Sequence, residues 1–287
     1  MKKKRIIPVL LLKNGQLVQS KRFSRHQVLG NPSAAVRRLS DWAADELVYL
    51  DISRDDHYDL GRDDLGSRNL QDIDAIVAEV ARASFMPITL GGRIRSLDDI
   101  ARRLATGADK VTLNTAALDD PNLIEAASRE YGSQCIVLSV DVLQQGDDYR
   151  VFTEGGRRDT GRRVEDWVRE AQERGAGEVM VNAIDRDGAR QGYDLALLDR
   201  VCASVHIPVI ALGGVGEWSH MAQALEQTGV DAVAAANIFH YTDQSVYLAR
   251  KYLFEQGLNV RSPQLLSLGA SSWNIAAAAC TPGPAST

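Results

Sequence analysis

Cysteine is scarce in this chain, and long apolar stretches are absent from it. Of 287 residues only three are cysteines, and their wide separation gives neither a disulfide framework nor the spacing of a metal site; they are Cys135, Cys202 and Cys280. No run of about 20 apolar residues occurs, so we expect no membrane span. These absences are typical of a reduced, cytoplasmic protein.

The basic start of the chain does not lead into a signal peptide. The lysines and the arginine at 2–5 are followed by a short apolar run, Ile6–Leu12, which contains Pro8, and no small-residue cleavage site comes after it. We therefore expect this run to be the first strand of the fold.

An excess of positive charge is absent too. The net charge is −5 and the pI is near 5.6, which argues against a nucleic-acid-binding surface, because such a surface needs clustered positive charge. The five histidines show no metal-ligand spacing with cysteine or acidic residues, so we expect neither a metal site nor a cofactor. With 45% hydrophobic residues, a chain of this length suits one α/β barrel.

What the chain does contain is a long internal repeat. The segment Pro87–Gly92 (PITLGG) recurs as Pro208–Gly214 (PVIALGG), and Thr106–Val111 (TGADKV) recurs as Thr228–Val233 (TGVDAV). Each copy is typical of a strand, a Gly-Gly turn, a helix, a glycine stop and a second strand. The repeat predicts two similar half-barrels, each with a phosphate-sized anion site at its Gly-Gly turn.

Strands and helices alternate along the whole chain, which predicts a single (β/α)₈ barrel over residues 1–262 with half-barrels at about 1–132 and 133–262. Strands are expected at 6–12, 47–52, 136–141, 178–182, 209–212 and 232–237. Helices are expected from 31–32 onward and at 70–80, 96–104, 164–174, 195–205, 219–227 and 242–256. The connections 53–68 and 144–162 (a small hairpin plus a basic loop) follow strands and belong to the catalytic face. Residues 263–287 have the composition of a disordered tail.

Several segments together resemble the cyclase subunit of imidazole glycerol phosphate synthase (HisF), over roughly residues 4–262. They are Lys4–Pro8, Asp45–Val48, Leu50–Ile52, Gly107–Val111, Asn114–Ala117, Arg174–Glu178 and Ile184–Gly188. The resemblance implies a (β/α)₈ barrel that works with a HisH-like glutaminase. Ammonia from that partner enters at the bottom of the barrel, passes through its core and meets a bis-phosphate substrate at the top.

Asp141 ends the fifth predicted barrel strand, a position that lies in the active site of such barrels. By the resemblance it matches one of two aspartates that act as general acid and base; the alternative is a structural carboxylate that caps a loop. The position of the other aspartate is occupied by Leu11, which cannot titrate. Asp51 belongs to the next strand and is not an evident substitute. The sequence therefore predicts negligible imidazole ring formation.

The resemblance also implies phosphate-binding groups in each half. They are Gly92, Arg93, Asn114 and Thr115 in the first half, and Asp187, Gly188, Gly214, Ala236 and Asn237 in the second. Arg93 replaces the third glycine of the family turn, and Gln19 stands where the family has a loop lysine. The alternative is a pocket for a different, larger or less phosphorylated ligand. The basic segment 154–158 is either a contact for an anionic substrate or a solvated loop.

Four charged residues stand at predicted strand starts and match the ring that gates the ammonia passage in the family: Arg5, Glu46, Lys110 and Glu178. Two acids and two bases around a narrow opening can neutralise one another and block water. The alternative is a set of ordinary salt bridges at strand ends.

These observations predict a HisF-like synthase subunit of a glutamine amidotransferase that conducts ammonia from a HisH-like glutaminase and holds a phosphorylated ligand. Leu11 and the Leu-Leu-Leu strand resemble the HisF-like proteins linked to amidine (acetamidino) groups on sugars of surface polysaccharides such as lipopolysaccharide O-antigen. One alternative is an authentic cyclase, a lyase of histidine biosynthesis. Another is a scaffold without catalysis that activates its glutaminase; the sequence leaves conduit and scaffold both open.

Overall fold

Eight parallel strands form a closed barrel in the computed structural model, which describes residues 2–53, 58, 72–83, 86–240 and 245–263. The barrel order is β1, β4, β5, β6, β7, β10, β11 and β12, and pairing of β12 with β1 closes it. The strands are Arg5–Lys13 (β1), Leu47–Asp51 (β4), Ile88–Gly91 (β5), Lys110–Leu113 (β6), Ile136–Gln145 (β7), Glu178–Ala183 (β10), Val209–Leu212 (β11) and Ala232–Ala235 (β12). This arrangement confirms the predicted (β/α)₈ fold.

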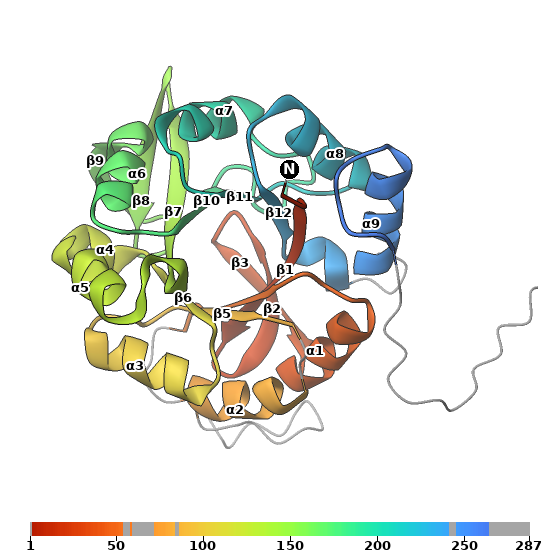
Figure 1. Cartoon of the computed structure of the whole chain (residues 1–287), viewed down its shortest axis with the longest axis horizontal. Coiled ribbons are helices and arrows are strands. Elements are labelled where there is room, and N and C mark those ends of the chain that lie inside the picture. The colour runs from red at the N-terminus through yellow and green to blue at the C-terminus, as the bar shows by residue number, and fades with distance from the viewer. Residues whose placement is uncertain (1, 54–57, 59–71, 84–85, 241–244, 264–287) are drawn as a thin grey trace, which may run out of the picture.

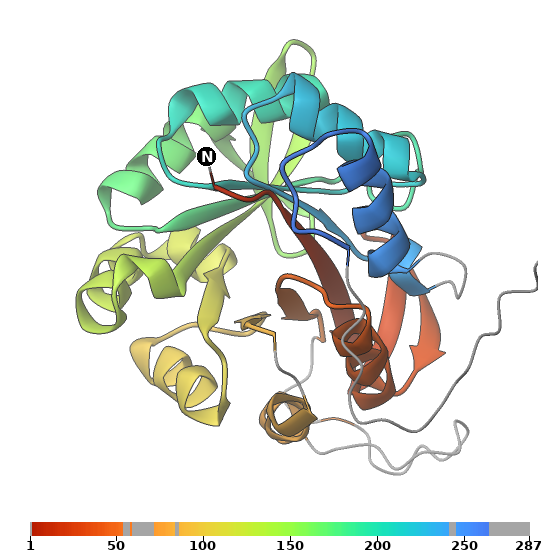
Figure 2. The same ribbon diagram turned by 45° about the vertical axis from the view of Figure 1, so that its right-hand side comes forward.

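A ring of helices surrounds these strands (Figures 1 and 2). The described helices are Pro32–Asp41 (α1), Ile73–Ala83 (α2), Leu97–Thr106 (α3), Thr115–Asp119 (α4), Asn122–Tyr131 (α5), Val164–Glu173 (α6), Leu195–Ser204 (α7), Trp218–Gln227 (α8) and Val246–Glu255 (α9), with 3₁₀ turns at Ser133–Cys135 (η1) and Asn237–His240 (η2). Over the described ranges, no helix is long and apolar enough to cross a membrane.

The element boundaries follow local signals closely. Helix α3 begins with the predicted capping box: Asp99 N–H donates to Ser96 Oγ at 3.2 Å, and Ser96 N–H donates to Asp99 Oδ2 at 3.1 Å. Strand β12 is shorter than predicted because the chain enters η2 at Asn237. The predicted tail beyond residue 263, nearly all of the 53–68 connection and the first turn of the 242–256 helix lie outside the described residues.

Two antiparallel hairpins extend the barrel, one after β1 and one after β7. Strands Gln16–Lys21 (β2) and Arg25–Gly30 (β3) form a hairpin that the sequence analysis missed. Its signal was present: Asn14 and Gly15 connect β1 to β2 with φ values of 50° and 76°, as a type I′ turn requires. In the second hairpin, Asp148–Thr153 (β8) pairs with Arg158–Arg163 (β9), so much of the predicted basic loop is a strand.

The core has two layers, separated by the wall of the barrel. Side chains that point inward form a cluster packed around the axis: Ile7, Val9, Val48, Val137, Met180, Ile210, Leu212, Ala232 and Ala234. Side chains that point outward pack against the helices in a larger cluster, which includes Leu10, Leu12, Tyr49 and Leu90. Because strand side chains alternate between faces, the register decides which polar residues line the barrel axis.

Candidate active site and gate at the two ends of the barrel

The strand starts carry a closed ring of four charged side chains, which we call the gate ring: Arg5, Glu46, Lys110 and Glu178. Arg5 donates to Glu46 at 2.9 Å and also bonds Glu178. Lys110 Nζ completes the ring with contacts of 3.0 Å to both glutamates. The glutamate side chains are 4% and 7% exposed and the two cations 24% and 22%. All four predicted residues therefore meet in one network of alternating charge.

The ring holds its charges in a partly buried place. Burial alone would raise the pKa of Glu46, but Lys110, the Thr89 hydroxyl and Arg5 outweigh it and lower that pKa. The Thr89 hydroxyl donates to Glu46 Oε1 at 2.7 Å. Burial likewise opposes the charge of Arg5, yet its bonds to Glu178 and Glu46 raise the pKa of Arg5. The ring thus keeps charged groups where water is largely excluded.

Aspartates beside the ring cap the strand starts. Asp109 Oδ2 accepts the Ile88 N–H at 2.8 Å, and Asp231 makes the equivalent bond to Val209 at 3.2 Å in the second half. Asp109 immediately precedes Lys110 of the ring. The caps satisfy backbone donors that the barrel ends would otherwise leave open.

The opposite end of the barrel contains Asp141, on the inner face of β7. Its carboxylate accepts hydrogen bonds from Asn114 Nδ2 at 2.9 Å and from Asn182 Nδ2 at 3.4 Å. Burial raises the pKa of Asp141 to about 6, and the charge of Asp187 acts in the same direction, while the two amides oppose it. Such a carboxyl group can exchange a proton near neutral pH, as a general acid or base must.

Leu11 points into the barrel and is surrounded by apolar side chains. It pairs with Leu50 of β4, and both side chains pack against the inner cluster, as does Ala236. No titratable group replaces the missing aspartate at this position. The wall formed by β1, β4, β11 and β12 is therefore apolar, while Asp141 lies on the polar wall opposite.

Asp51 does not substitute for the aspartate that Leu11 replaces. Asp51 pairs with Leu12, whose side chain belongs to the outer layer, and its own side chain is fully buried. Its carboxylate accepts the Tyr58 hydroxyl at 2.7 Å and the Ser53 N–H at 2.9 Å, and Arg93 Nη1 lies 3.9 Å away. Burial and the Asp51 charge raise the pKa of Tyr58. Asp51 is thus part of a cluster with Arg93 and Tyr58.

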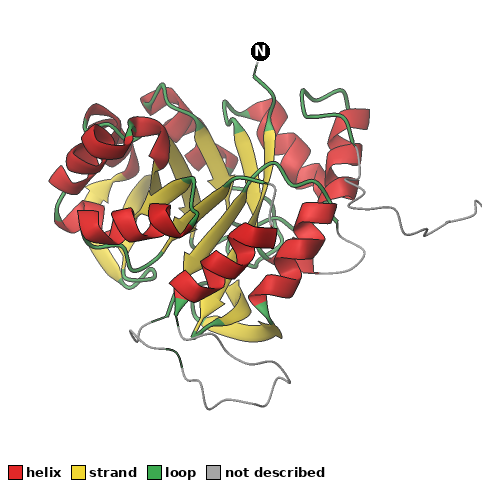
Figure 3. Cartoon of the chain, turned by 60° about the horizontal axis from the view of Figure 1, so that its bottom comes forward, coloured by secondary structure: helices red, strands yellow, loops and turns green. Residues whose placement is uncertain are grey.

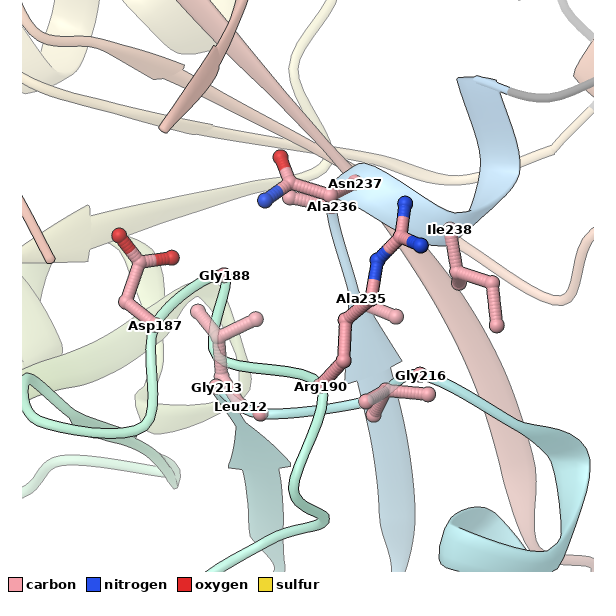
Figure 4. A pocket seen from close by; sticks show the side chains of 12 residues that line it. Asp187, Gly188, Arg190, Leu212, Gly213, Gly216, Ala235, Ala236, Asn237 and Ile238 are labelled. Atoms are coloured by element: carbon pink, nitrogen blue, oxygen red, sulfur yellow. The ribbon is translucent and has the colours of Figure 1, made fainter. Parts of the chain in front are cut away.

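A cavity of ≈ 240 Å³ lies at the second-half Gly-Gly turn, between the ends of β10, β11 and β12. Its lining includes the predicted phosphate-site residues of this half: Asp187, Gly188, Gly214, Ala236 and Asn237. Figure 4 shows the cavity from close by. Arg190, which the sequence analysis did not single out, also lines it, and its side chain extends toward η2 (Figure 4). A Cβ at Gly214 would lie 2.1 Å from the Gly192 carbonyl oxygen, so only glycine fits this turn.

Two residues of this cavity also hold the β2–β3 hairpin. Asp187 Oδ2 accepts the Ser20 hydroxyl at 2.8 Å and the Phe23 N–H at 3.2 Å. Asn237 Nδ2 donates to the Ser20 carbonyl at 2.7 Å. Burial raises the pKa of Asp187, although these bonds oppose the shift. Gln19, at the position of the family lysine, bonds Gln27 across the hairpin at 3.2 Å.

The first-half residues have other contacts. Asn114 donates to Asp141, and Thr115 Oγ1 accepts the Glu154 N–H at 3.4 Å. In the basic segment, Arg158 bonds Asp119 at 2.5 Å. No three acidic, histidine or cysteine side chains among the described residues are placed to hold a metal ion.

A family model described as "Histidine biosynthesis protein" matches residues 5–245. This chain belongs to the histidine biosynthesis protein family. The match covers all eight barrel strands and both ends of the barrel, and it confirms the HisF-like assignment made from the motifs. The histidine biosynthesis protein family includes cyclase and isomerase enzymes.

Proposed function

We propose that this family member is the synthase subunit of a glutamine amidotransferase: it takes ammonia from a HisH-like glutaminase and conducts it along the barrel axis without forming an imidazole ring. The observation that carries the proposal is the contrast between the two barrel ends. The gate ring is complete and closed. At the other end, an apolar Leu11 stands where the family's second catalytic aspartate would be.

The interior between the two ends suits a small polar molecule. Three buried hydroxyl groups lie on β7, which carries Asp141, and on the two strands before it in the barrel: Ser139 on β7, Thr112 on β6 and Thr89 on β5. Ser139 pairs with Met180 of the inner cluster, so it faces the axis. Ammonia both donates and accepts hydrogen bonds, and these hydroxyls provide partners on a path from Glu46 to Asp141. The apolar opposite wall disfavours ions.

The product that we propose is an amidine (acetamidino) group on a surface-polysaccharide sugar, made with a separate amidotransferase that carries out the sugar chemistry. The support is the resemblance of the Leu-Leu-Leu first strand to that branch of HisF-like proteins. The cavity at the second-half turn would hold the phosphorylated ligand.

An authentic cyclase is the second candidate, and one observation favours it. Asp141 has a pKa raised to about 6 by burial, which suits proton transfer near neutral pH. Direct assay of imidazole glycerol phosphate formation separates the two candidates.

The conduit is tested by opening the gate ring in the full complex. Lys110→Ala leaves Glu46 and Glu178 facing Arg5 alone. Two carboxylates that share one cation leave an uncompensated negative charge in a constricted, partly buried place, which is costly, so the ring should loosen and admit water. We expect glutamine hydrolysis to continue while nitrogen incorporation falls, so that the ratio of glutamine consumed to nitrogen incorporated rises about threefold or more.

Arg169→Ala is the matched control. It removes an exposed arginine that pairs with Asp166 at 3.3 Å on α6. The control should leave the ratio unchanged. An unchanged ratio in both Lys110→Ala and Glu178→Ala would mean that the ring is only structural, and the conduit proposal would then fail in favour of the scaffold.

A further inference from the structure

The two halves of the barrel differ at their equivalent turns. By strand position, Gly92 and Arg93 in the first half correspond to Gly213 and Gly214 in the second. All four residues have left-handed backbone: φ is 88° and 59° in the first turn, and 95° and 102° in the second. The backbone of the anion-binding turn is thus kept in both halves, although an arginine rarely adopts this conformation. Arg93 therefore adds a side chain to a turn built for glycine.

That side chain is directed to an internal partner. The Arg93 guanidinium is 17% exposed and lies 3.9 Å from the Asp51 carboxylate, which is completely buried. Gly92 is packed so closely on the Asp51 backbone that a Cβ there would lie 2.0 Å from the Asp51 carbonyl oxygen. The charge of Arg93 is compensated inside the protein, and a phosphate dianion at this turn would approach the Asp51 carboxylate.

The other polar side chains of the first half also have partners inside the protein. Asn114 Nδ2 donates to Asp141, and the Thr115 hydroxyl oxygen accepts the Glu154 N–H. In the second half, four glycines line a ≈ 240 Å³ cavity at the turn: Gly188, Gly213, Gly214 and Gly216. Arg190 lines it as well, and so does Asp187, whose carboxylate accepts hydrogen bonds from Ser20 and Phe23. A cavity bounded by glycines exposes backbone N–H groups to an anion.

We infer that the barrel mouth binds a ligand with a single phosphate group, held in the second-half cavity, and that the Arg93–Asp51 pair has removed the first-half phosphate site. The single-phosphate ligand is the phosphorylated ligand of the proposed function, and the inference rests on that function only for what the ligand does. Gly213 of this cavity lies beside Asn182, since a Cβ at Gly213 would be 2.9 Å from Asn182 Oδ1. Asn182 in turn donates to Asp141, so the uncharged end of the ligand would extend toward Asp141.

The test compares two matched sugar phosphates, glucose 6-phosphate and glucose 1,6-bisphosphate, by titration calorimetry on the full chain at low salt. The wild type should bind both with affinities within about threefold, since only one phosphate is held. Arg190→Ala should weaken both by about tenfold, the usual effect of losing a charge-assisted contact. Arg93→Gly suits the backbone of the turn and should leave glucose 6-phosphate unchanged while tightening the bisphosphate about fivefold or more.

Arg95→Ala is the control for loss of a nearby exposed arginine and should change neither affinity. A wild type that prefers the bisphosphate about tenfold, with the preference lost in Arg93→Gly, would overturn the inference, because Arg93 would then be a phosphate ligand. Lack of saturable binding to either sugar phosphate would overturn it too. These titrations use the barrel without its glutaminase, so their failure leaves the nitrogen-transfer ratio, and with it the conduit, separately testable.

Discussion

At the residue scale, the protonation of Asp141 connects the barrel mouth to stability. Its carboxylate takes two amide hydrogen bonds, and the Oδ1 atoms of the same two amides, Asn114 and Asn182, are buried without a hydrogen-bond partner. Either amide can therefore turn over and offer its oxygen instead. The site can thus accept a neutral side chain that donates a hydrogen bond as readily as a carboxylate.

We expect Asp141→Asn to be more stable than the wild type above pH 6. The folded pKa is raised from 3.8 to about 6, so the stability that the protonated group contributes is present below pH 4 and is lost as pH rises through 6. The loss is on the order of 2 to 3 kcal/mol. Urea unfolding from pH 4 to pH 8 should show the advantage of the variant growing between pH 4 and about 6 and then levelling off. A constant difference would contradict the raised pKa.

Leu11 leads to a prediction about activity. Because leucine cannot shuttle a proton, the wild type should form negligible imidazole glycerol phosphate even with ammonium supplied directly. A general acid–base group typically contributes about 10²–10⁴-fold to the rate of a reaction. Leu11→Asp should restore little, since Gln19 and Arg93 also depart from the family, and Leu11→Asn is its uncharged control. Wild-type turnover equal to that of an ordinary cyclase would refute this prediction and favour the second candidate.

At the scale of elements, the two hairpins after β1 and β7 lie over the mouth of the barrel and meet there. Figure 3 shows the N-terminus at one end of the barrel, which is where the parallel strands start. The carboxyl ends of the strands, and the hairpins that follow β1 and β7, therefore lie at the opposite end. A Cβ at Gly156, in the β8–β9 turn, would lie 3.2 Å from the Phe23 ring of the β2–β3 hairpin. Asp187 secures that hairpin through Ser20 and Phe23.

Asp187→Ala should release the β2–β3 hairpin. The Phe23 amide donates to the Asp187 carboxylate, and the Arg22 amide donates to its carbonyl at 3.0 Å. Loss of the charged acceptor should speed hydrogen exchange at both amides by about tenfold or more. Asp185→Ala removes a neighbouring acid without these bonds and is the control. Unchanged exchange in Asp187→Ala would show that the Asp187 carboxylate is not needed and that strand pairing and the Asn237–Ser20 bond hold the hairpin.

At the scale of the whole molecule, the gate ring joins the two halves of the barrel. Arg5, Glu46 and Lys110 come from the first half and Glu178 from the second, so the ring connects strands far apart in the chain. Each charge of the ring is balanced by two neighbours. The losses in the free energy of unfolding caused by substitutions in the ring should therefore be non-additive.

A double-mutant cycle measures this coupling. Lys110→Met and Glu178→Gln should each cost about 3 kcal/mol in urea unfolding at pH 7, since each leaves a partly buried charge with fewer partners. The double variant should be less destabilised than the sum by about 1 to 3 kcal/mol. Additive losses would show that Lys110 and Glu178 do not interact in solution, despite the 3.0 Å contact.

The sequence by itself determined the architecture and the members of the gate ring. Repeated Gly-Gly turns, alternating apolar strands and the Ser96 capping box are local signals, and strand starts in a parallel barrel must share one end. The β2–β3 hairpin was predictable as well, since Asn14-Gly15 is a local turn signal.

Only the tertiary structure decided how the barrel mouth is arranged. A shift of one residue in register exchanges the faces of a strand, and this is why Leu11 lines the axis while Asp51 lies outside it. The pairing of Arg93 with Asp51 and of Asp187 with Ser20 depends on contacts between distant segments, which no local pattern encodes. Residue type predicts what a side chain can do, but its partners are set by packing.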